Sequence, residues 1–522
     1  MIRNPRLDWG KLLTEDRLPK ADDAAKNEPD WLVHSRTETE RDFDRILFAT
    51  PTRRLGDKTQ VFPLDRTESV RNRLTHSHEV SNLARSVGTY FVHSPLFSKI
   101  LKDAGSGVSD QSKLMRAIPA MLAAAGLAHD LGNPPFGHQG EEAIRSWISR
   151  NEKHLWPDCD AVRKNYGGFP EPYRLALLAD VGRMNAAHRA DFLCFEGNAQ
   201  TIRTLTRLQV VKDDRGLNLT FGTLAALMKY TVGSCEAKGK QARPSERKCG
   251  FFESEAGLVR KIRAGAGLGG TIRHPLAYLI EACDDIAYLV VDAEDAIKKR
   301  VVSFHDLIAW LRSKNVGNPD LLIGWLTKKG EMDAAEARNH KVPPSEVSDV
   351  SMQVFRANAI SAMISAVINE FERRYDEIMT VGLDRPLLDE SIAARLAEAL
   401  KEFDVEHAYK NRRVLEIELT GYNTIQELMS MLWQGIVERE SFVTIGSQRT
   451  SPFARYAYGR ISENYRRVFE QSRQSPQGED PLPVRYREVQ LLTDMIAGMT
   501  DRFAMDLYRE LKEFHVAASP AN

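Results

Sequence analysis

The stretch that constrains the fold most is residues 127–141, which read L-A-H-D-L-G-N-P-P-F-G-H-Q-G-E. The small apolar residues before it, Ala117 to Leu127, predict a buried helix, and a His-Asp pair ends that helix. Neighbouring helical residues point about 100° apart, so both side chains of the pair can bind one ion only near a helix end. The glycine and prolines that follow provide such an end. An imidazole nitrogen beside a carboxylate oxygen suits a divalent metal, and the turn can bring His138 and Glu141 back over the same spot.

The chain is long enough to surround such a site with a sizeable core. Its 522 residues exceed the ~100–200 of an ordinary domain, which favours one large core with subdomains or two to three domains. Hydrophobic residues make up 42% and charged residues 28%, as in a globular protein and unlike a disordered or membrane protein. Lys plus Arg and Asp plus Glu both total 72, so any binding of polyanions would depend on local basic patches.

The cysteines and the apolar segments indicate the compartment. The 5 cysteines are odd in number and contain no C-x-x-C spacing, which favours reduced thiols in a cytoplasm. The first residues form no apolar core of a signal peptide, and no segment approaches the ~20 uncharged apolar residues of a membrane span. We therefore expect a cytoplasmic protein without a membrane contact.

A second histidine lies on the apolar face of a predicted helix over residues 68–92. His76, Val80, Leu83 and Val87 are spaced i, i+4, i+7 and i+11, which places them on one stripe of that helix. His76 should therefore point inward. A lone histidine on an apolar face is more often a hydrogen-bonded core residue than a ligand, so His76 alone does not predict a metal site.

A third helix begins at Pro275 and places an acid among apolar residues. Its stripe includes Ile280 and Ala287, and Asp284 lies between them on the same face. A carboxylate on an apolar face needs a partner. Tyr288 and Asp292 follow at steps of four, so one line of the helix offers two carboxylates and a phenol to the interior.

The rest of the chain carries weaker patterns. Residues 1–40 are polar and interrupted by prolines, which predicts a surface arm, and residues 233–250 read as a polar loop rich in lysine and arginine. Residues 301–522 read as successive amphipathic helices. Within them, basic and aromatic residues alternate in a pattern that could meet nucleic acid or could be a charged helix surface: Tyr456, Tyr458, Arg460, Tyr465, Arg466, Arg467 and Arg473.

Three helices thus each place a costly polar group on a buried face, namely His76, the pair His129 and Asp130, and Asp284. Two imidazoles and two carboxylates, with positions left for water and substrate, suit octahedral Mn²⁺, Mg²⁺ or Fe²⁺ better than closed structural zinc. Along the chain these residues follow the order histidine, His-Asp pair, aspartate, which resembles the HD phosphohydrolase superfamily. The first histidine stands in R-L-T-H-S, the last aspartate in E-A-C-D-D-I-A-Y, and F-E-G-N-A-Q lies between the His-Asp pair and that aspartate. The long H-D-L-G-N-P-P-F-G-H-Q-G-E form resembles the bacterial dGTP triphosphohydrolase branch of that superfamily.

The resemblance implies an all-α fold with an arm over residues 1–40, an HD catalytic core over 41–300 and a helical C-terminal region over 301–522 that packs on the core. It implies hydrolysis of a deoxynucleoside triphosphate, dGTP foremost, at the α-phosphorus, with release of the deoxynucleoside and inorganic triphosphate. The implied cofactor is Mg²⁺ or Mn²⁺, with Fe²⁺ or Co²⁺ as further candidates. Members of the branch are often homo-oligomers and some bind single-stranded DNA, which makes both candidate partners.

The resemblance also assigns residues. His76, His129, Asp130 and Asp284 would hold the metal, and His138 with Glu141 would act on the attacking water or the leaving 5′ oxygen. The geometry of an imidazole oriented by a carboxylate fits such an acid/base pair. The remaining positions divide into those around the triphosphate, Arg73, Lys229, Tyr230, Lys248, Tyr288 and Asp292, and those near the sugar or phosphates, Gln60 and Asn198.

Two other functions stay open. An HD phosphohydrolase acting on another nucleotide would share the metal site and differ in its products. A regulatory protein that responds to single-stranded nucleic acid would keep the fold with little turnover. The presence of both His138 and Glu141 argues against the second alternative, because a site that has lost its activity needs neither.

Overall fold

Helices form nearly all of the regular structure. The computed structural model describes residues 6–18, 36–60, 71–105, 111–209, 215–340, 342–410, 412–471 and 482–518. Among these residues the strands are β1 (Val232–Gly233) and β2 (Cys249–Phe251), which pair in parallel. The all-α prediction is confirmed. The expected loop over 233–250 is wrong at its two ends, because these ends pair with each other as β1 and β2.

The site is built on three packed helices, α5 (Arg73–His93), α7 (Gln111–Ala128) and α16 (Pro275–Lys298). The α5 and α7 backbones touch through glycines: a Cβ on Gly88 would lie 2.8 Å from the Cα of Pro119, and one on Gly126 would lie 2.9 Å from the Cα of Ser81. The helix predicted from the apolar run that starts at Ala117 begins earlier, at Gln111, so Pro119 lies inside α7. This close contact leaves the end of α7 held firmly against α5.

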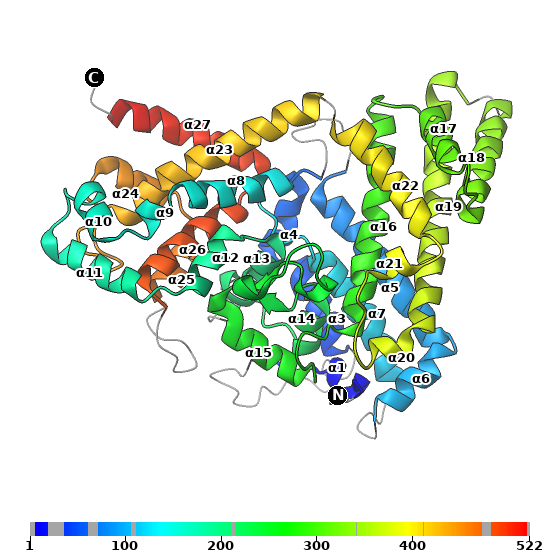
Figure 1. Ribbon diagram of the computed structural model, residues 1–522, viewed down its shortest axis with the longest axis horizontal. Coiled ribbons are helices and arrows are strands. Elements are labelled where there is room, and N and C mark those ends of the chain that lie inside the picture. The colour runs from blue at the N-terminus through cyan, green and yellow to red at the C-terminus, as the bar shows by residue number, and fades with distance from the viewer. Residues whose placement is uncertain are drawn as a thin grey trace.

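The buried hydrophobic residues form two clusters. The helices that carry them can be followed in Figure 1. The first unites α5, α7 and α16 with α17 (Phe304–Lys314), α18 (Leu321–Asn339), α19 (Pro344–Arg373), α20 (Tyr375–Ile378), α21 (Leu387–Glu390) and α22 (Ala394–Asp404). The second unites α8 (Gly137–Arg150) and α9 to α13 with α23 (Arg412–Val437), α24 (Pro452–Gly459), α25 (Glu463–Gln471), α26 (Val484–Ala497) and α27 (Asp501–Ala518). Leu131 belongs to the first cluster and Phe136 to the second, so the turn after His129 and Asp130 lies where the clusters meet.

The other elements are short and surround this framework. They are α1 (Trp9–Leu12), α3 (Glu38–Leu47), α4 (Thr50–Arg54), η1 (Leu55–Asp57), α6 (Leu96–Asp103), α9 (Glu152–Leu155), α10 (Cys159–Asn165), α11 (Glu171–Gly182), α12 (Ala186–Leu193), α13 (Gly197–Arg203), η2 (Thr204–Leu208), α14 (Phe221–Leu227), η3 (Ser234–Glu236), η4 (Pro244–Glu246), η5 (Glu253–Glu255), α15 (Ala256–Gly265) and η6 (Val405–Tyr409). Of the predicted N-terminal arm, Trp9 and Leu12 are buried in the first cluster, and residues 1–5 and 19–35 lie outside the described residues.

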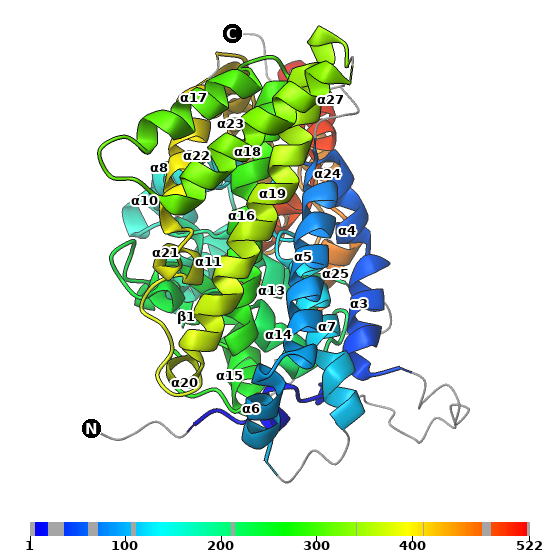
Figure 2. The ribbon, with the colours of Figure 1, turned by 90° about the vertical axis from the view of Figure 1, so that its right-hand side faces the viewer.

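One stretch among the described residues, Glu346–Arg373 of α19, is long and apolar enough to cross a membrane. In its most apolar part, 44% of the residues are buried inside the protein. Figure 2 shows α19 running beside α16, and it also packs against α18. The core helix of a globular protein has the same length and composition, so this stretch is weak support for a membrane span.

The basic and aromatic residues predicted as a surface in the C-terminal region do not share one face. Tyr458 and Tyr465 are buried, where the Tyr458 hydroxyl donates to Glu470 at 2.7 Å and the Tyr465 hydroxyl accepts from Arg54 at 3.0 Å. Tyr456 is exposed, and Arg473 lies outside the described residues. Two of the three tyrosines therefore act as core residues and are not available to stack on a nucleobase.

Candidate metal centre and active site

The structure brings the four predicted metal ligands together from three helices. His76 is on α5, His129 and Asp130 follow α7, and Asp284 is on α16. The ligand atoms of His76, His129 and Asp130 all lie within 4.8 Å of one another. Asp284 Oδ1 lies 3.0 Å from His76 Nε2 and 3.3 Å from His129 Nε2, so its carboxylate faces both imidazoles.

Neighbouring groups hold the His129 and Asp130 side chains in place. The Nδ1 of His129 lies 2.7 Å from the carbonyl oxygen of Gly126, which fixes the ring so that Nε2 faces the cluster. Asp130 accepts from the Arg73 guanidinium at 2.5 Å and from the Asn133 amide at 2.5 Å. The buried His129 Nε2 has no hydrogen-bond partner among the described residues. An oriented nitrogen without a hydrogen bond, facing two carboxylates, is a suitable donor for a divalent cation.

The charges around the cluster also favour a cation. Burial alone would lower the pKa of His129, but Asp130 and Asp284 raise it to about 9. Burial would likewise raise the pKa of Asp284, but the imidazoles of His129 and His76 hold it well below its usual range. The carboxylates that draw a proton to His129 would draw a metal ion to the same place, and the donor set therefore fits one.

His138 and Glu141 form the predicted pair on the first turns of α8. His138 Nδ1 lies 3.2 Å from Glu141 Oε2, while Glu141 Oε1 accepts from the backbone N–H of Gly197 at 2.9 Å. Glu141 is 3% exposed and the His138 side chain is 84% exposed. A buried, anchored carboxylate thus orients an accessible imidazole, the arrangement that a general acid or base needs.

Arg73 lies between the four candidate metal ligands and the pair formed by His138 and Glu141. Besides its ion pair with Asp130, its guanidinium passes so close to α8 that a Cβ on Gly137 would lie 2.8 Å from one of its nitrogens. Burial opposes its charge, but Asp130, and to a smaller extent Asp501 and Glu141, raise the pKa of Arg73. Arg73, predicted to contact the triphosphate, is therefore a buried cation between the candidate metal ligand Asp130 and the start of α8.

Lys248 and Asn198 meet on a residue that the sequence did not single out. The Lys248 ammonium lies 3.0 Å from one carboxylate oxygen of Glu196, and the Asn198 amide donates to the other at 2.9 Å. Burial and the nearby charge of Glu141 raise the pKa of Glu196. Glu196 stands in the F-E-G-N-A-Q stretch, two residues before Asn198. Its position in this motif was the signal that could have identified it as a site residue. Lys248 immediately precedes strand β2.

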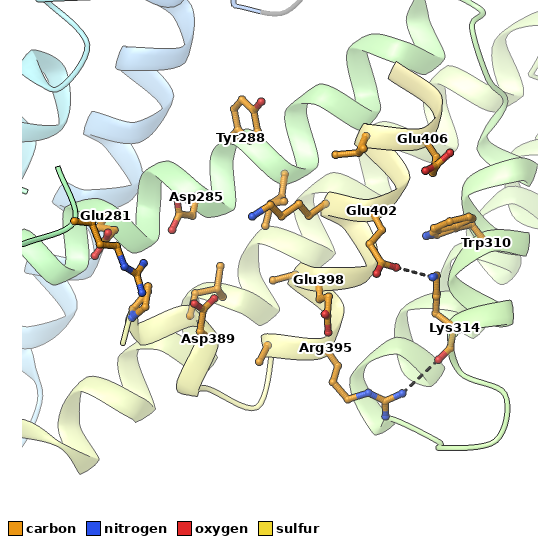
Figure 3. Close-up of a pocket in the computed structure, with 18 of the residues that line it drawn as sticks. Glu281, Asp285, Tyr288, Trp310, Lys314, Asp389, Arg395, Glu398, Glu402 and Glu406 are labelled. Atoms are coloured by element: carbon orange, nitrogen blue, oxygen red, sulfur yellow. Dashed lines mark hydrogen bonds and ion pairs between the residues drawn. The ribbon is translucent and has the colours of Figure 1, made fainter. Parts of the chain in front are cut away.

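Lys229, Tyr230 and Tyr288 line a cavity of about 1160 Å³ (Figure 3). Helix α16 contributes Glu281, Asp285 and Tyr288, and α22 contributes Glu398 and Glu402. The Lys229 ammonium lies 3.6 Å from Glu281. Burial would lower the pKa of Lys229, but the charges of Glu281 and Asp285 raise it. A cavity of this volume is large enough for a nucleotide.

The last two predicted residues are placed differently. Asp292 is buried and accepts from the Tyr409 hydroxyl at 2.5 Å, and it does not line the cavity. Burial raises the pKa of Asp292 well above its usual range. The side-chain oxygen of Gln60 is buried without a hydrogen-bond partner among the described residues, and the preceding Thr59 pairs with Asn72 at the start of α5. A substrate role for both residues stays a prediction.

The buried Lys58 should make the stability of the protein depend on pH. Its buried amine donates to the carbonyls of Asn133 at 2.6 Å and Ala497 at 2.8 Å, and burial with the charge of Arg73 lowers its pKa to about 7. An unfolded lysine has a pKa of about 10.4, so between these values the unfolded chain holds a proton that the folded chain lacks. The free energy of unfolding should therefore rise with pH, by up to about 1.4 kcal/mol per pH unit from Lys58.

The variant Lys58→Met should lose the contribution of Lys58 to the pH dependence of the free energy of unfolding. Urea denaturation of both proteins at several pH values between about 7 and 10 would measure it. We expect the free energy of unfolding of the wild type to rise relative to that of the variant across this window. Parallel pH profiles would contradict the lowered pKa of Lys58.

Comparison with known proteins gives the family. No family model matches the chain. It is 33% identical over 503 residues to a deoxyguanosinetriphosphate triphosphohydrolase-like protein of Listeria innocua, covering 96% of this chain and 99% of that protein. The chain belongs to the deoxyguanosinetriphosphate triphosphohydrolase family.

Further relatives cover most of the chain as well. A probable deoxyguanosinetriphosphate triphosphohydrolase of Pseudomonas aeruginosa is 30% identical over 490 residues, covering 91% of this chain and 92% of its own. A deoxyguanosinetriphosphate triphosphohydrolase of Serratia proteamaculans is 29% identical over 486 residues, covering 90% and 93%. The family resemblance expected from the motifs is confirmed, and the similarity to these relatives extends over 90–96% of this chain.

Proposed function

We propose that this protein hydrolyses deoxynucleoside triphosphates, with dGTP the favoured substrate, at the α-phosphorus, and releases the deoxynucleoside and inorganic triphosphate. The observation that carries the proposal is the convergence of two imidazoles and two carboxylates, in which the buried His129 Nε2 faces Asp284 and has no hydrogen-bond partner among the described residues. The names of the relatives support the substrate class. The neighbouring pair of His138 and Glu141 supports hydrolysis over mere binding.

His76, His129, Asp130 and Asp284 would hold the metal, Mg²⁺ or Mn²⁺ first, with Fe²⁺ or Co²⁺ as further candidates. Nitrogen and oxygen donors of this kind are shared by all four ions. A bound divalent ion would polarise a phosphoryl oxygen and lower the pKa of a water molecule. Arg73 keeps Asp130 ionised, because its guanidinium, with the charge of His129, lowers the pKa of that carboxyl against the effect of burial.

His138 would exchange a proton with the attacking water or the leaving 5′ oxygen through Nε2, since its Nδ1 faces Glu141. Lys229 and Lys248, which are ion-paired with Glu281 and Glu196, would neutralise charge on the triphosphate together with Arg73. The remaining proposed substrate contacts are Gln60, Asn198, Tyr230, Tyr288 and Asp292.

The wider assignments rest on the family resemblance. We propose that residues 41–300 carry the chemistry, that residues 1–40 form an arm, and that residues 301–522 form a helical region that packs on the core. Work in the cytoplasm, assembly into a homo-oligomer and binding of single-stranded DNA are proposals of the same kind.

The test is to incubate the purified protein with each deoxynucleoside triphosphate and Mg²⁺ or Mn²⁺, and to resolve the products by ion-exchange chromatography. We expect equal amounts of deoxynucleoside and inorganic triphosphate, with the fastest turnover for dGTP. Release of diphosphate or of single phosphate would contradict attack at the α-phosphorus and would point to another nucleotide hydrolase. No turnover of any nucleotide, with or without single-stranded DNA, would favour the regulatory alternative.

A further inference from the structure

The turn before His138 has a strained backbone. Phe136 has a φ of 60° and Gly137 a φ of 57°, so two consecutive residues occupy the left-handed region immediately before the proposed acid/base pair. A bulky residue such as phenylalanine adopts this conformation only when its surroundings enforce it. The contacts around Phe136 therefore decide the direction in which α8 leaves the turn.

Those contacts come from the far end of the chain. Asp501, the first residue of α27, is 2% exposed, and its Oδ1 accepts from the backbone N–H of Phe136 at 2.9 Å. Its Oδ2 accepts from the backbone N–H of Thr59 at 2.9 Å and from the Thr59 hydroxyl. The carboxylate thus ties the strained residue to a segment that is itself paired with the start of α5.

Two further contacts limit the turn. Lys58 links the carbonyl of Asn133, at the beginning of the turn, to that of Ala497, four residues before Asp501. The ring of Phe136 lies on Gly421 of α23, where a Cβ would come within 2.4 Å of the ring carbon Cγ. Asn133 is therefore held by Lys58, and Phe136 is held by Asp501 and Gly421 of the C-terminal region.

We propose that Asp501 is a positioning residue for the reaction, which fixes the strained turn at Phe136 and thereby the place of His138 and Glu141 relative to the metal ligands. The proposal rests on the proposed function in assigning a catalytic role to His138. Its physical basis is that displacement of a reacting group by ~1 Å can reduce the rate by about 100-fold. It also gives the helices after α22 a part in catalysis.

The variant Asp501→Asn tests the proposal because it keeps the volume of the side chain and removes one of the two acceptors. Asp180→Asn is the matched control: Asp180 is 7% exposed and likewise accepts two backbone N–H groups, from Val484 at 2.9 Å and Arg485 at 2.8 Å, at the start of α26. Both variants lose a similar anchor of a C-terminal helix, but only Asp501 contacts the turn.

We expect kcat of Asp501→Asn to fall about 10- to 100-fold, with KM for dGTP within about threefold of wild type. Binding of Mn²⁺, measured by titration calorimetry, should not change, because none of the four metal ligands lies on the part of the turn that Asp501 holds. Asp180→Asn should keep kcat. Equal losses in the two variants, or an unchanged kcat in Asp501→Asn, would overturn the proposal.

Hydrogen exchange of the amides of residues 133–141 gives a readout that does not need turnover. It should quicken at least about tenfold in Asp501→Asn and stay as in wild type in Asp180→Asn. If the wild-type protein hydrolysed no deoxynucleoside triphosphate, the proposed function would fail, while the exchange rates would still show whether Asp501 holds the turn. Unchanged exchange in Asp501→Asn would refute the positioning role.

Discussion

Replacement of His129 by alanine is expected to lower kcat/KM for dGTP by about 10³-fold or more. His129 Nε2 lies 3.3 Å from Asp284 and 3.5 Å from Asp130, so the imidazole is the group that both carboxylates share. Its loss removes one donor of the proposed metal site, and a bound metal is worth several kcal/mol in the transition state of phosphoryl chemistry. Steady-state kinetics with Mg²⁺ and Mn²⁺, together with titration of Mn²⁺, would measure the effect.

A matched control is available on α5. His78 is exposed and lies two residues from the proposed ligand His76, so His78→Ala should keep both activity and metal binding, while His76→Ala should lose both. Removal of metal with a chelator should reproduce the loss in wild type, and addition of Mn²⁺ should reverse it. Activity of His129→Ala within about tenfold of wild type would be too high for a metal ligand.

The four candidate metal ligands could be predicted to lie together because the sequence around each one, within its own helix, indicates that its side chain points inward. The helical spacing of apolar residues placed His76 and Asp284 inward, and the end of a small apolar run placed His129 and Asp130. A polar group on a buried face needs a partner, so three such faces suggested one shared site. The structure brings these side chains together as expected.

The supporting residues could not be predicted, because their partners lie far away in the sequence. Glu196 reaches Lys248 across 52 residues, and Asp501 reaches Phe136 across 365. No periodicity encodes such pairs, and a carboxylate at the first turn of a helix is ordinary capping chemistry unless its partner is known. The pairing of β1 with β2 was missed for the same reason, since strands of two and three residues give no alternating pattern.

The arrangement of the C-terminal helices is also a result of long-range packing. The sequence indicated amphipathic helices after residue 301 without showing what each covers. In the structure α19 and α22 pack on α16, the helix that carries Asp284, and α23 packs on α8, the helix that carries His138. The helices that follow the motif-rich part of the chain therefore support both halves of the proposed site.

The second large effect is expected at the pair of His138 and Glu141. His138→Ala should lower kcat by about 10²- to 10⁴-fold, the usual contribution of a general acid or base, while Mn²⁺ binding stays intact. Glu141→Gln should cause a smaller loss, because the amide can still accept from Gly197 but no longer carries the charge that orients the imidazole at 3.2 Å. Glu142→Gln is the matched control, since Glu142 is 58% exposed and pairs with Arg145.

The double variant of this pair decides whether the two residues act as one unit. If Glu141 works only through His138, then His138→Ala with Glu141→Gln should be no slower than His138→Ala alone, because effects within one catalytic unit are not additive. Additive losses would mean that the carboxylate has a separate role, for which its contact with Gly197 in F-E-G-N-A-Q is the available route. A loss of metal binding in either variant would contradict the division into a metal cluster on α5, α7 and α16 and a proton-transfer pair on α8.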